Sequence, residues 1–303
     1  MARELVLAAP SSSTESGLTP RSPIVYTVLV NWNGWPDTDH CLRSLRNLNY
    51  PNNHVVVIDN ASTDDSVLQI RKSQPEVRIV ESHRNGGFGA GCNIGISLAL
   101  EERANYIWLL NNDAQAAPDA LAAMIQVAEA DPRMGAIGSV IYDLDRDTIQ
   151  TWGGGRITWW GASKHFISPR AADRLDYISG ASLLLRAAAV REIGLFDEDF
   201  FMYWEDTDLC FRLRKDGWKL AVAENAKISH KMCGSTGRGS PLMHEHKLNS
   251  YVRFFRKHYR FARPLLAAGL LGRMVADTLR QNTSRSRLLL RSLRASQQPF
   301  TEL

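Results

Sequence analysis

Between residues 24 and 138 the chain alternates short apolar runs with stretches of helical periodicity. Strands are expected at 24–30, 55–58, 77–80 and 106–110, and helices at 37–48, 65–72, 90–103 and 118–130. Because a helix separates each strand from the next, the pattern predicts an α/β fold in which helices cover a mostly parallel sheet. Ligands of such sheets bind at the carboxyl ends of the strands, so the residues that follow each strand are the first candidates for a site.

The strand at 106–110 is followed directly by Asn111, Asn112 and Asp113. A carboxylate that a buried strand delivers to this edge can bind a divalent metal, which in turn can bind a diphosphate. The same residue types also turn a chain well. Taken alone, this segment is compatible with a turn and with a metal site.

Asp59 follows the strand at 55–58 in the same way. Its carboxylate can accept a hydrogen bond from the N3–H of uracil or thymine, a donor that adenine and cytosine lack. In the structural alternative, Asp59 only starts the turn while Ser62 or Asp64 caps the next helix. The two roles involve different residues and are compatible.

Glycines are dense in residues 85–95, at the start of the helix expected at 90–103. They allow the backbone to approach a ligand closely, and a helix N-terminus favours anionic groups. The segment departs from the dinucleotide-binding fingerprint because Ile94 stands where its last glycine would be required. A nicotinamide oxidoreductase would need that fingerprint after the first strand, where residues 31–34 read Asn-Trp-Asn-Gly, so this class is disfavoured.

Three carboxylates, Glu205, Asp206 and Asp208, follow the aromatic stretch 201–204. Like charges beside apolar rings should raise the pKa of at least one of these groups, as a general base requires. The alternative is an ordinary helix start in which Glu205 and Asp208 pair with Arg212 at helical spacing.

Taken in order, these motifs resemble those of the family 2 glycosyltransferases of the GT-A fold, particularly the rhamnosyltransferase-like branch. The resemblance spans residues 24–260 and rests on Asn31-Trp32-Asn33-Gly34, Ile58-Asp59-Asn60-Ala61-Ser62-Thr63-Asp64, Asn85-Gly86-Gly87-Phe88, Asn111-Asn112-Asp113 and Trp204-Glu205-Asp206. It implies an inverting transfer of a sugar from a nucleoside diphosphate sugar to an acceptor hydroxyl. It also implies a divalent metal, Mg or Mn, that holds the diphosphate.

The resemblance assigns donor-binding roles to individual positions. Nucleotide-sugar binding falls to Asn31, Trp32, Asn33 and Asp59 around the base, to Arg84, Asn85 and Asn93 near the ribose and diphosphate, and to Asn111 and Asn112. Asp113 matches the last acid of the family's DxD metal motif, and His230 matches a late histidine that completes the metal site in some relatives. Asn111 stands where that motif has its first acid, which removes one charge from the expected metal site.

Asp206 matches the catalytic carboxylate of the family, and Glu205 is the second candidate for that role. Trp159, Trp160 and Gly180 lie where relatives bind acceptors, although the two tryptophans could equally cover the sheet. The expected donor is dTDP-rhamnose, followed by UDP-linked hexoses, and the expected acceptor is a glycan or a lipid-linked glycan. A non-catalytic sugar-binding or assembly subunit of the same fold is the rival, and it predicts loss of the base or of the metal carboxylate.

Three segments are expected along the chain. Residues 1–22 form a disordered tail, 23–250 form the GT-A domain with a nucleotide-binding half (23–138) and an acceptor half (139–250), and 251–303 form a basic amphipathic helical tail. In 253–294, eleven Lys or Arg accompany one acid, which gives +10 and leaves −6 for the rest of a chain of net charge +4. This tail can lie on anionic lipid or pack on the body with a solvated basic face.

Composition limits the other possibilities. The four cysteines show no paired spacing, which indicates reduced thiols rather than a zinc cage or a disulfide framework. No apolar run approaches the roughly eighteen residues of a membrane span. No nucleic-acid-binding module accompanies the basic tail, so nucleic acid is not expected as a partner. We therefore expect a cytoplasmic protein that can associate peripherally with the cytoplasmic face of the inner membrane.

Overall fold

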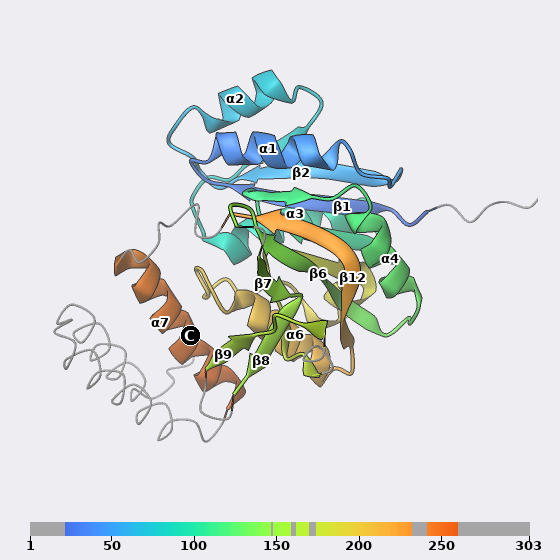
Figure 1. Cartoon of the computed structure of the whole chain (residues 1–303). Helices are drawn as coiled ribbons and strands as arrows, with labels where there is room; N and C mark the ends of the chain where they lie inside the picture. The colour runs from blue at the N-terminus through green and yellow to red at the C-terminus, as the bar shows by residue number, and fades with distance from the viewer. Residues whose placement is uncertain (1–21, 147, 159–161, 170–173, 232–240, 260–303) are drawn as a thin grey trace, which may run out of the picture.

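The computed structural model describes residues 22–259, except 147, 159–161, 170–173 and 232–240 (Figure 1). Within these residues a nine-stranded sheet forms the centre, ordered β3-β2-β1-β4-β11-β6-β12-β5, with β7 paired to β6. Its strands are β1 (Val25–Asn31), β2 (Asn53–Asp59), β3 (Arg78–Glu81), β4 (Tyr106–Leu110), β5 (Ala114–Ala116), β6 (Met134–Asp143), β7 (Ile149–Trp152), β11 (Ser182–Arg186) and β12 (Lys219–His230).

A smaller sheet and seven helices complete the described part of the chain. The small sheet is ordered β10-β8-β9 and consists of β8 (Gly154–Ile157), β9 (Ser163–His165) and β10 (Tyr177–Ile178). The helices are α1 (Trp35–Leu45), α2 (Ser66–Ser73), α3 (Phe88–Glu101), α4 (Ala120–Glu129), α5 (Ala187–Ile193), α6 (Glu205–Lys215) and α7 (Pro241–His258).

The first half of the chain follows the predicted βα alternation. β1 pairs in parallel with β2 and β4, and β2 pairs in parallel with β3. Beyond β4 the sheet becomes mixed, because β11 runs antiparallel to both β4 and β6. The predicted α/β fold is confirmed.

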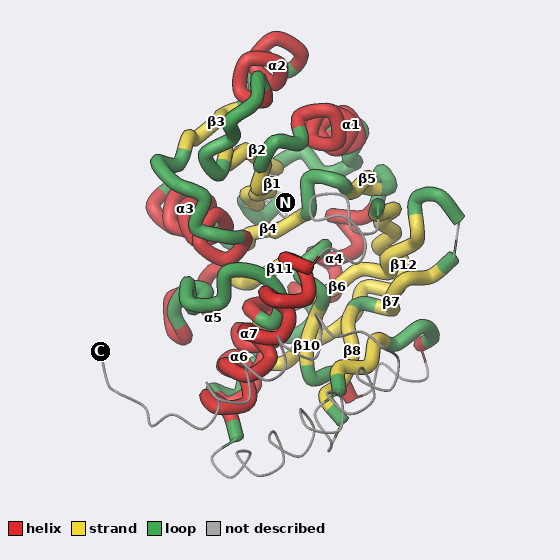
Figure 2. Tube along the Cα trace, turned by 90° about the vertical axis from the view of Figure 1, so that its left-hand side faces the viewer, coloured by secondary structure: helices red, strands yellow, loops and turns green. Residues whose placement is uncertain are grey.

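The central sheet is buried on both faces. In β4, Ile107 and Leu109 point into one core, which α3 and α6 also line, whereas Trp108 and Leu110 point into the other, which α1 and α4 line. This alternation is the side-chain period of a strand, and burial on both faces explains why β4 reads as an unbroken apolar run. In Figure 2, β1, β2 and β4 accordingly lie between α3 and α1.

Two glycines allow α3 to pack unusually close to β1. A Cβ built on Gly95 would lie 2.3 Å from Val28 Cγ1, and one built on Gly91 would lie 2.8 Å from Val30 Cγ1. The Val28 side chain has little freedom at χ1, and its Cβ also lies 3.2 Å from the Cβ built on Gly95. A change of the Val28 rotamer therefore cannot relieve the contact. The glycines at this i, i+4 spacing therefore set the distance between helix and sheet.

The long helix α7 packs on the body of the domain. Its buried face contributes Tyr251, Val252, Phe254 and Phe255 to a third apolar cluster with Phe200. The helix thus crosses the boundary expected at residue 250, and residues 251–258 of the expected tail contact the domain through an apolar face. The tail predicted at the N-terminus and most of the predicted basic tail fall in 1–21 and 260–303, which lie outside the described residues.

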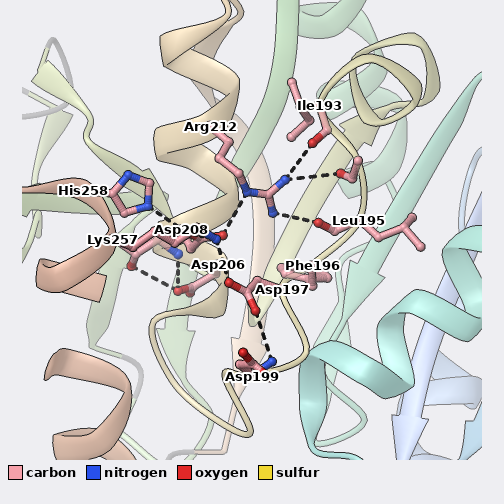
Figure 3. A network of polar contacts seen from close by, with 12 residues as sticks. Ile193, Leu195, Phe196, Asp197, Asp199, Asp206, Asp208, Arg212, Lys257 and His258 are labelled. Atoms are coloured by element: carbon pink, nitrogen blue, oxygen red, sulfur yellow. Dashed lines mark hydrogen bonds and ion pairs between the residues drawn. The ribbon is translucent and has the colours of Figure 1, made fainter. Parts of the chain in front are cut away.

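An ionic network joins α7 to α6 (Figure 3). Asp208, whose carboxylate is fully buried, accepts hydrogen bonds from Arg212 Nε (2.9 Å) and His258 Nε2 (2.7 Å) and lies 2.8 Å from Lys257 Nζ. Burial alone would raise the pKa of this carboxyl, but the donors from His258 and Lys257 and the charge of Arg212 together lower it to about 2. Asp208 is therefore an ionised anchor for the last turn of α7.

In the described part of the chain, no helix combines the length and the apolarity that a membrane span needs. Three cysteines, Cys41, Cys92 and Cys210, are free and buried, and Cys233 falls among the residues that are not described.

Gly95→Ala tests the close packing of α3. At an open helix position this change would stabilise the protein by about 1 kcal/mol, because alanine has the higher helix propensity. Here the methyl group would collide with Val28, and we expect the free energy of unfolding to fall by about 1–3 kcal/mol. Denaturant unfolding measures it. Ser97→Ala on the same helix is the control, with a change within about 0.5 kcal/mol; a stabilised Gly95→Ala protein would contradict the packing.

Asp208→Asn tests the anchor between α6 and α7. The folded-state pKa lies below the ordinary value, so the stabilising contribution is present above about pH 4 and is lost as the pH falls through about 2. We expect the variant to lose about 2 kcal/mol at neutral pH, with the difference from wild type shrinking toward about pH 2. Urea unfolding across this range measures the difference. Asp176→Asn, which breaks the more exposed pair with Arg214, should cost less.

Candidate functional site

The carboxyl ends of β1, β2 and β4 meet at one edge of the sheet, where a chain of buried polar side chains joins them. Asn112 Nδ2 donates to Thr38 Oγ1 (2.9 Å), and Thr38 Oγ1 donates to Asn31 Oδ1 (2.8 Å). Asn31 Nδ2 in turn donates to Asp59 Oδ1 (2.8 Å). All four side chains are buried, so each hydrogen bond replaces one to water. Thr38, on α1, was not predicted from the sequence.

Asp59 holds the loop that follows β2. Its Oδ1 accepts from Ser62 Oγ (2.6 Å) and its Oδ2 accepts from the Ser62 amide (2.9 Å). The cap predicted at Ser62 or Asp64 is wrong, because the N-cap of α2 is Asp65, which makes no side-chain cap hydrogen bond; Asp64 Oδ1 only accepts from the Ser66 amide (3.0 Å) in the turn that leads into the helix. The turn role of Asp59 is thus visible in the structure, and its three hydrogen bonds within the described residues leave one lone-pair position, on Oδ2.

The loop after β1 is fixed against the same segment. Asn33 has a left-handed backbone (φ 50°), and its Oδ1 accepts from the Thr63 amide (2.8 Å). This arrangement leaves the ring of Trp32 40% exposed at the sheet edge. A large exposed aromatic face beside a polar edge is suited to stacking against a planar ring.

The residues expected near the ribose and diphosphate divide into two groups. Asn93 on α3 uses both amide hydrogens within the chain, toward Phe196 O and Glu198 Oε1 (3.0 Å each), and therefore ties α3 to the segment after α5. Asn85 Oδ1 accepts from Asn60 Nδ2 (3.0 Å) and from the Gly87 amide (2.9 Å), which orders the glycine loop. Arg84 is exposed, and within the described residues its guanidinium has no partner.

Asp113 and His230 are brought together, although they are far apart in sequence. His230 Nε2 lies 3.1 Å from Asp113 Oδ1, an oxygen that has no hydrogen-bond partner despite its burial. Gln150 Nε2 donates to the His230 carbonyl (2.7 Å), which turns Gln150 Oε1 toward His230 Nδ1 (3.0 Å). Nδ1 is therefore the donor toward Gln150, and in neutral His230 the lone pair of Nε2 faces the carboxylate.

This pair of groups fits a divalent cation. Two electron-pair donors that face one another at 3.1 Å cannot form a hydrogen bond, so a cation between them would satisfy both. Asn111 joins them, with its Nδ2 at 3.1 Å from His230 Nε2. Among the described residues, no cluster of three or more His, Cys, Asp or Glu has metal-site spacing, so a metal here would need further ligands from Asn111, from water or from a bound ligand. Gln150 was not predicted from the sequence.

Glu205 and Asp206 begin α6 on the other side of the same edge. The two residues before them, Tyr203 and Trp204, are both left-handed, with φ of 67° and 70°. Asp206 is half-buried and accepts three hydrogen bonds, from the Gly180 amide (2.8 Å), the Thr207 amide (2.6 Å) and Thr207 Oγ1 (3.1 Å). Asp208 pairs with Arg212 as the helix alternative predicts.

The pKa values of the two carboxyls are raised to different extents. Burial raises the pKa of Glu205 well above its ordinary value, and the charge of Asp206 raises it further. Its Oε2 has no hydrogen-bond partner. Burial also raises the pKa of Asp206; the donors from Gly180 and Thr207 lower it only in part, so it stays above its ordinary value. The larger rise is that of Glu205, so the surroundings favour ionisation of Asp206 over that of Glu205.

The acceptor residues expected from the sequence are placed only in part. Gly180 contacts Asp206 through its amide, and a Cβ at this position would lie 3.3 Å from Asp206 Oδ2. Trp159 and Trp160 lie outside the described residues. The small sheet adds a pair that was not predicted, His165 Nδ1 and the Tyr177 hydroxyl, 3.3 Å apart and close enough to Asp206 for their charges to interact. Their signal in the sequence is weak, since β9 and β10 are very short.

Comparison with known proteins agrees with this geometry. Residues 26–194 match the model of Glycosyl transferase family 2. An N-acetylglucosaminyl-diphospho-decaprenol L-rhamnosyltransferase of Mycobacterium tuberculosis is 29% identical over 297 residues, which cover 89% of this chain and 94% of that protein. The dTDP-rhamnosyl transferase RfbF of Shigella flexneri is 22% identical over 248 residues, which cover 78% of this chain and 81% of RfbF.

A solved structure supports the fold. Mannosyltransferase PcManGT from Pyrobaculum calidifontis, in complex with GDP-Man and Mn2+, superposes with a TM-score of 0.59 at 18% identity, covering 90% of this chain and 75% of that one. The similarity of architecture accords with the strand-end motifs, which occur in the expected order along the sheet edge. The protein has the GT-A fold and belongs to glycosyl transferase family 2.

Proposed function

We propose that this protein is an inverting, metal-dependent glycosyltransferase that moves rhamnose from dTDP-rhamnose to a hydroxyl of a glycan or lipid-linked acceptor in cell-envelope assembly. The observation that carries the proposal is the pair at the start of α6, in which Asp206 accepts from the Gly180 amide and Thr207 while Glu205 Oε2 has no partner, at the sheet edge that also holds Asp113 and His230. The two relatives named for rhamnosyl transfer support the sugar, and one of them supports a diphospho-lipid acceptor. UDP-linked hexoses are the second choice of donor.

The nucleotide half of the donor would bind at the ends of β1 and β2. Trp32 offers an exposed ring for the base, and Asn31, Asn33 and Asp59 supply polar groups around it. Arg84 is exposed beside the glycine loop, where its free guanidinium can pair with a phosphate.

Asp113 and His230 would hold a Mg or Mn ion, whose chemistry is to offset the negative charge that builds on the departing diphosphate. Asn111 can join them, because half a turn of its amide would replace Nδ2 with Oδ1 at the same place. Gln150 keeps His230 in the tautomer that a ligand requires, since it occupies Nδ1.

Asp206 would act as the general base. The acceptor hydroxyl loses its proton to an Asp206 oxygen while its own oxygen forms a bond to the anomeric carbon, and the bond from that carbon to the diphosphate breaks on the opposite face. Neutral Glu205 avoids a second negative charge next to the developing nucleophile. No covalent enzyme intermediate is needed, because a single displacement inverts the anomeric centre. Binding aligns the acceptor oxygen with that carbon.

The protein would work at the cytoplasmic face of the inner membrane. The basic composition of residues 253–294 supports contact with anionic lipid, where a lipid-linked acceptor would be found.

Asp113→Ala and Gln150→Leu test the metal site. In calorimetric titrations we expect dTDP to bind wild type more tightly when Mn is present, and we expect this gain to vanish in Asp113→Ala. Gln150→Leu should weaken the affinity for Mn by about 10- to 100-fold, because it removes the partner that fixes the His230 tautomer. Asp119→Ala, an exposed carboxylate near α4, is the control and should behave as wild type. Equal Mn dependence in Asp113→Ala would exclude the proposed ligands, and a preference for GDP over dTDP and UDP would exclude the proposed donors.

Asp206→Asn and Glu205→Gln test the base. Asp206→Asn should lower kcat by about 100- to 10,000-fold, because the amide cannot take the acceptor proton. Glu205→Gln should keep most of the activity, since an amide has nearly the shape and the neutral charge of the protonated acid. Transfer of radiolabelled sugar from the donor measures both. Equal losses in the two variants would show that Glu205 is ionised or takes part in proton transfer, contrary to the proposed division of roles.

A further inference from the structure

The backbone that leads into Glu205 and Asp206 is strained. Tyr203 and Trp204 have φ values of 67° and 70°, a left-handed conformation that non-glycine residues with large side chains rarely adopt. Two such residues in succession persist only where their surroundings hold them. The direction in which α6 begins, and with it the position of Asp206, depends on whatever holds this turn.

Helix α7 supplies contacts to each residue from 201 to 204. The ring of Trp204 lies between those of Phe254, Tyr251 and Phe255, at centroid distances of 4.9, 5.5 and 5.8 Å. Before it, Ser250 Oγ donates to the Met202 carbonyl (2.8 Å). At the ends of the segment, Phe201 stacks on His246 (4.6 Å), and Lys247 Nζ lies 4.7 Å from the ring centre of Tyr203.

The start of α3 holds the same segment from the opposite side. The Phe88 amide donates to the Phe201 carbonyl (3.0 Å). A Cβ on Gly87 would lie only 2.0 Å from that carbonyl oxygen, so the two backbones touch. Residues 201–204 thus contact α7 along their whole length, and Phe201 also contacts the glycine loop of the nucleotide-binding half.

The rest of α6 has separate anchors. Asp208 is held by Lys257 and His258, and Arg212 donates to the carbonyls of Ile193 (2.9 Å) and Leu195 (2.7 Å), as Figure 3 shows. Loss of the Trp204 contacts would therefore release the first turn of α6 while the later turns stay in place. The hydrogen bond between the Gly180 amide and Asp206 Oδ2 is the contact that such a release would break.

We propose that α7 is part of the catalytic apparatus and that Trp204 is a positioning residue, through which α7 sets the orientation of Asp206. Both lie beyond residues 26–194, the part that matches the family model, and the resemblance that includes Trp204 in its last motif gives this residue no role. The inference rests on the proposed function in so far as Asp206 is the base. Because α7 holds the turn directly before Glu205 and Asp206, we expect the helix to affect turnover as well as stability.

Phe211 offers a matched control for Trp204. Both aromatic side chains project from the start or middle of α6, both are half-buried, and both rings lie 4.9 Å from the ring of Phe254. Phe211 is more than one helical turn away from Asp206, and its ring contacts the rings of Phe254, His258 and Tyr259. Shortening either ring should weaken the packing of α7, but only one of them borders the catalytic carboxylates.

The experiment compares Trp204→Leu, Trp204→Phe and Phe211→Leu in the full chain. We expect Trp204→Leu to lower kcat by about 100-fold while KM for the donor stays near that of wild type, because the base is misplaced and the nucleotide site is intact. Trp204→Phe should restore most of kcat, since an aromatic ring again fills the space. Phe211→Leu should lower the midpoint of thermal unfolding by a similar amount to Trp204→Leu and leave kcat near wild type. Equal kcat in the two leucine variants would overturn the proposal.

A second readout separates this inference from the proposed function. Amide hydrogen exchange at Gly180 reports its bond to Asp206 and needs no substrate. Exchange should become faster in Trp204→Leu and stay unchanged in Phe211→Leu. If Gly180 is as protected in Trp204→Leu as in wild type, the positioning role is wrong whatever the activity. If exchange changes as expected but wild type transfers no sugar from any nucleoside diphosphate donor with Mn, the structural coupling stands and the proposed function fails.

Discussion

The hydrogen-bonded chain from Asn112 through Thr38 and Asn31 to Asp59 is the contact on which the rest of the site depends. It fixes three strand ends relative to one another with side chains that are buried and mutually satisfied. Loss of one member would leave its neighbour without a partner in a medium of low dielectric constant, which costs far more than the bond itself contributes. Asp113 follows Asn112 directly in the sequence. The series of hydrogen bonds therefore also sets the position of Asp113, the proposed metal ligand, relative to the loops after β1 and β2 that are proposed to bind the nucleobase.

The opposite side of the site is organised by charge rather than by neutral hydrogen bonds. Glu205 and Asp206 are adjacent and buried to different degrees, and the backbone donors act on Asp206. One negative charge is therefore localised where donors can stabilise it, and the second is removed by protonation. Two residues further along α6, Asp208 remains ionised because His258 and Lys257 donate hydrogen bonds to it and Arg212 and Lys257 add positive charge beside it. The pKa values of three carboxyls within four positions thus differ, and each is set by its own neighbours.

Much of this architecture could be predicted from the sequence, because strongly periodic segments leave few alternatives. The strands of the first half agree with prediction to within a residue or two, since buried strands read as apolar runs that end in polar residues. The pairing of Asp113 with His230 followed from family resemblance, and their proximity is met in the structure.

The features that prediction missed depend on tertiary contacts. Thr38 and Gln150 are ordinary polar residues whose roles appear only when strands distant in sequence meet. His165 and Tyr177 come from strands of two or three residues, too short to give a periodic signal. For the apolar residues of α7 the sequence leaves two alternatives, contact with lipid and packing on the body, because amphipathicity alone does not distinguish a lipid surface from a protein surface; residues 251–258 pack on the body.

The orientation of β11 has a consequence for how such an edge can be equipped. A parallel strand brings its carboxyl end to this edge, and its last carbonyl groups with it. Since β11 runs the other way beside β4, it brings its beginning, with Ser182 opposite Leu110 and the Ala181 carbonyl bonded to the Asn111 amide (3.0 Å). The amide of Gly180, just ahead of that strand, is thereby free to point at Asp206. One reversed strand thus places a backbone donor at a position where an all-parallel sheet would have placed acceptors, and the anion there needs no cationic side chain to hold it.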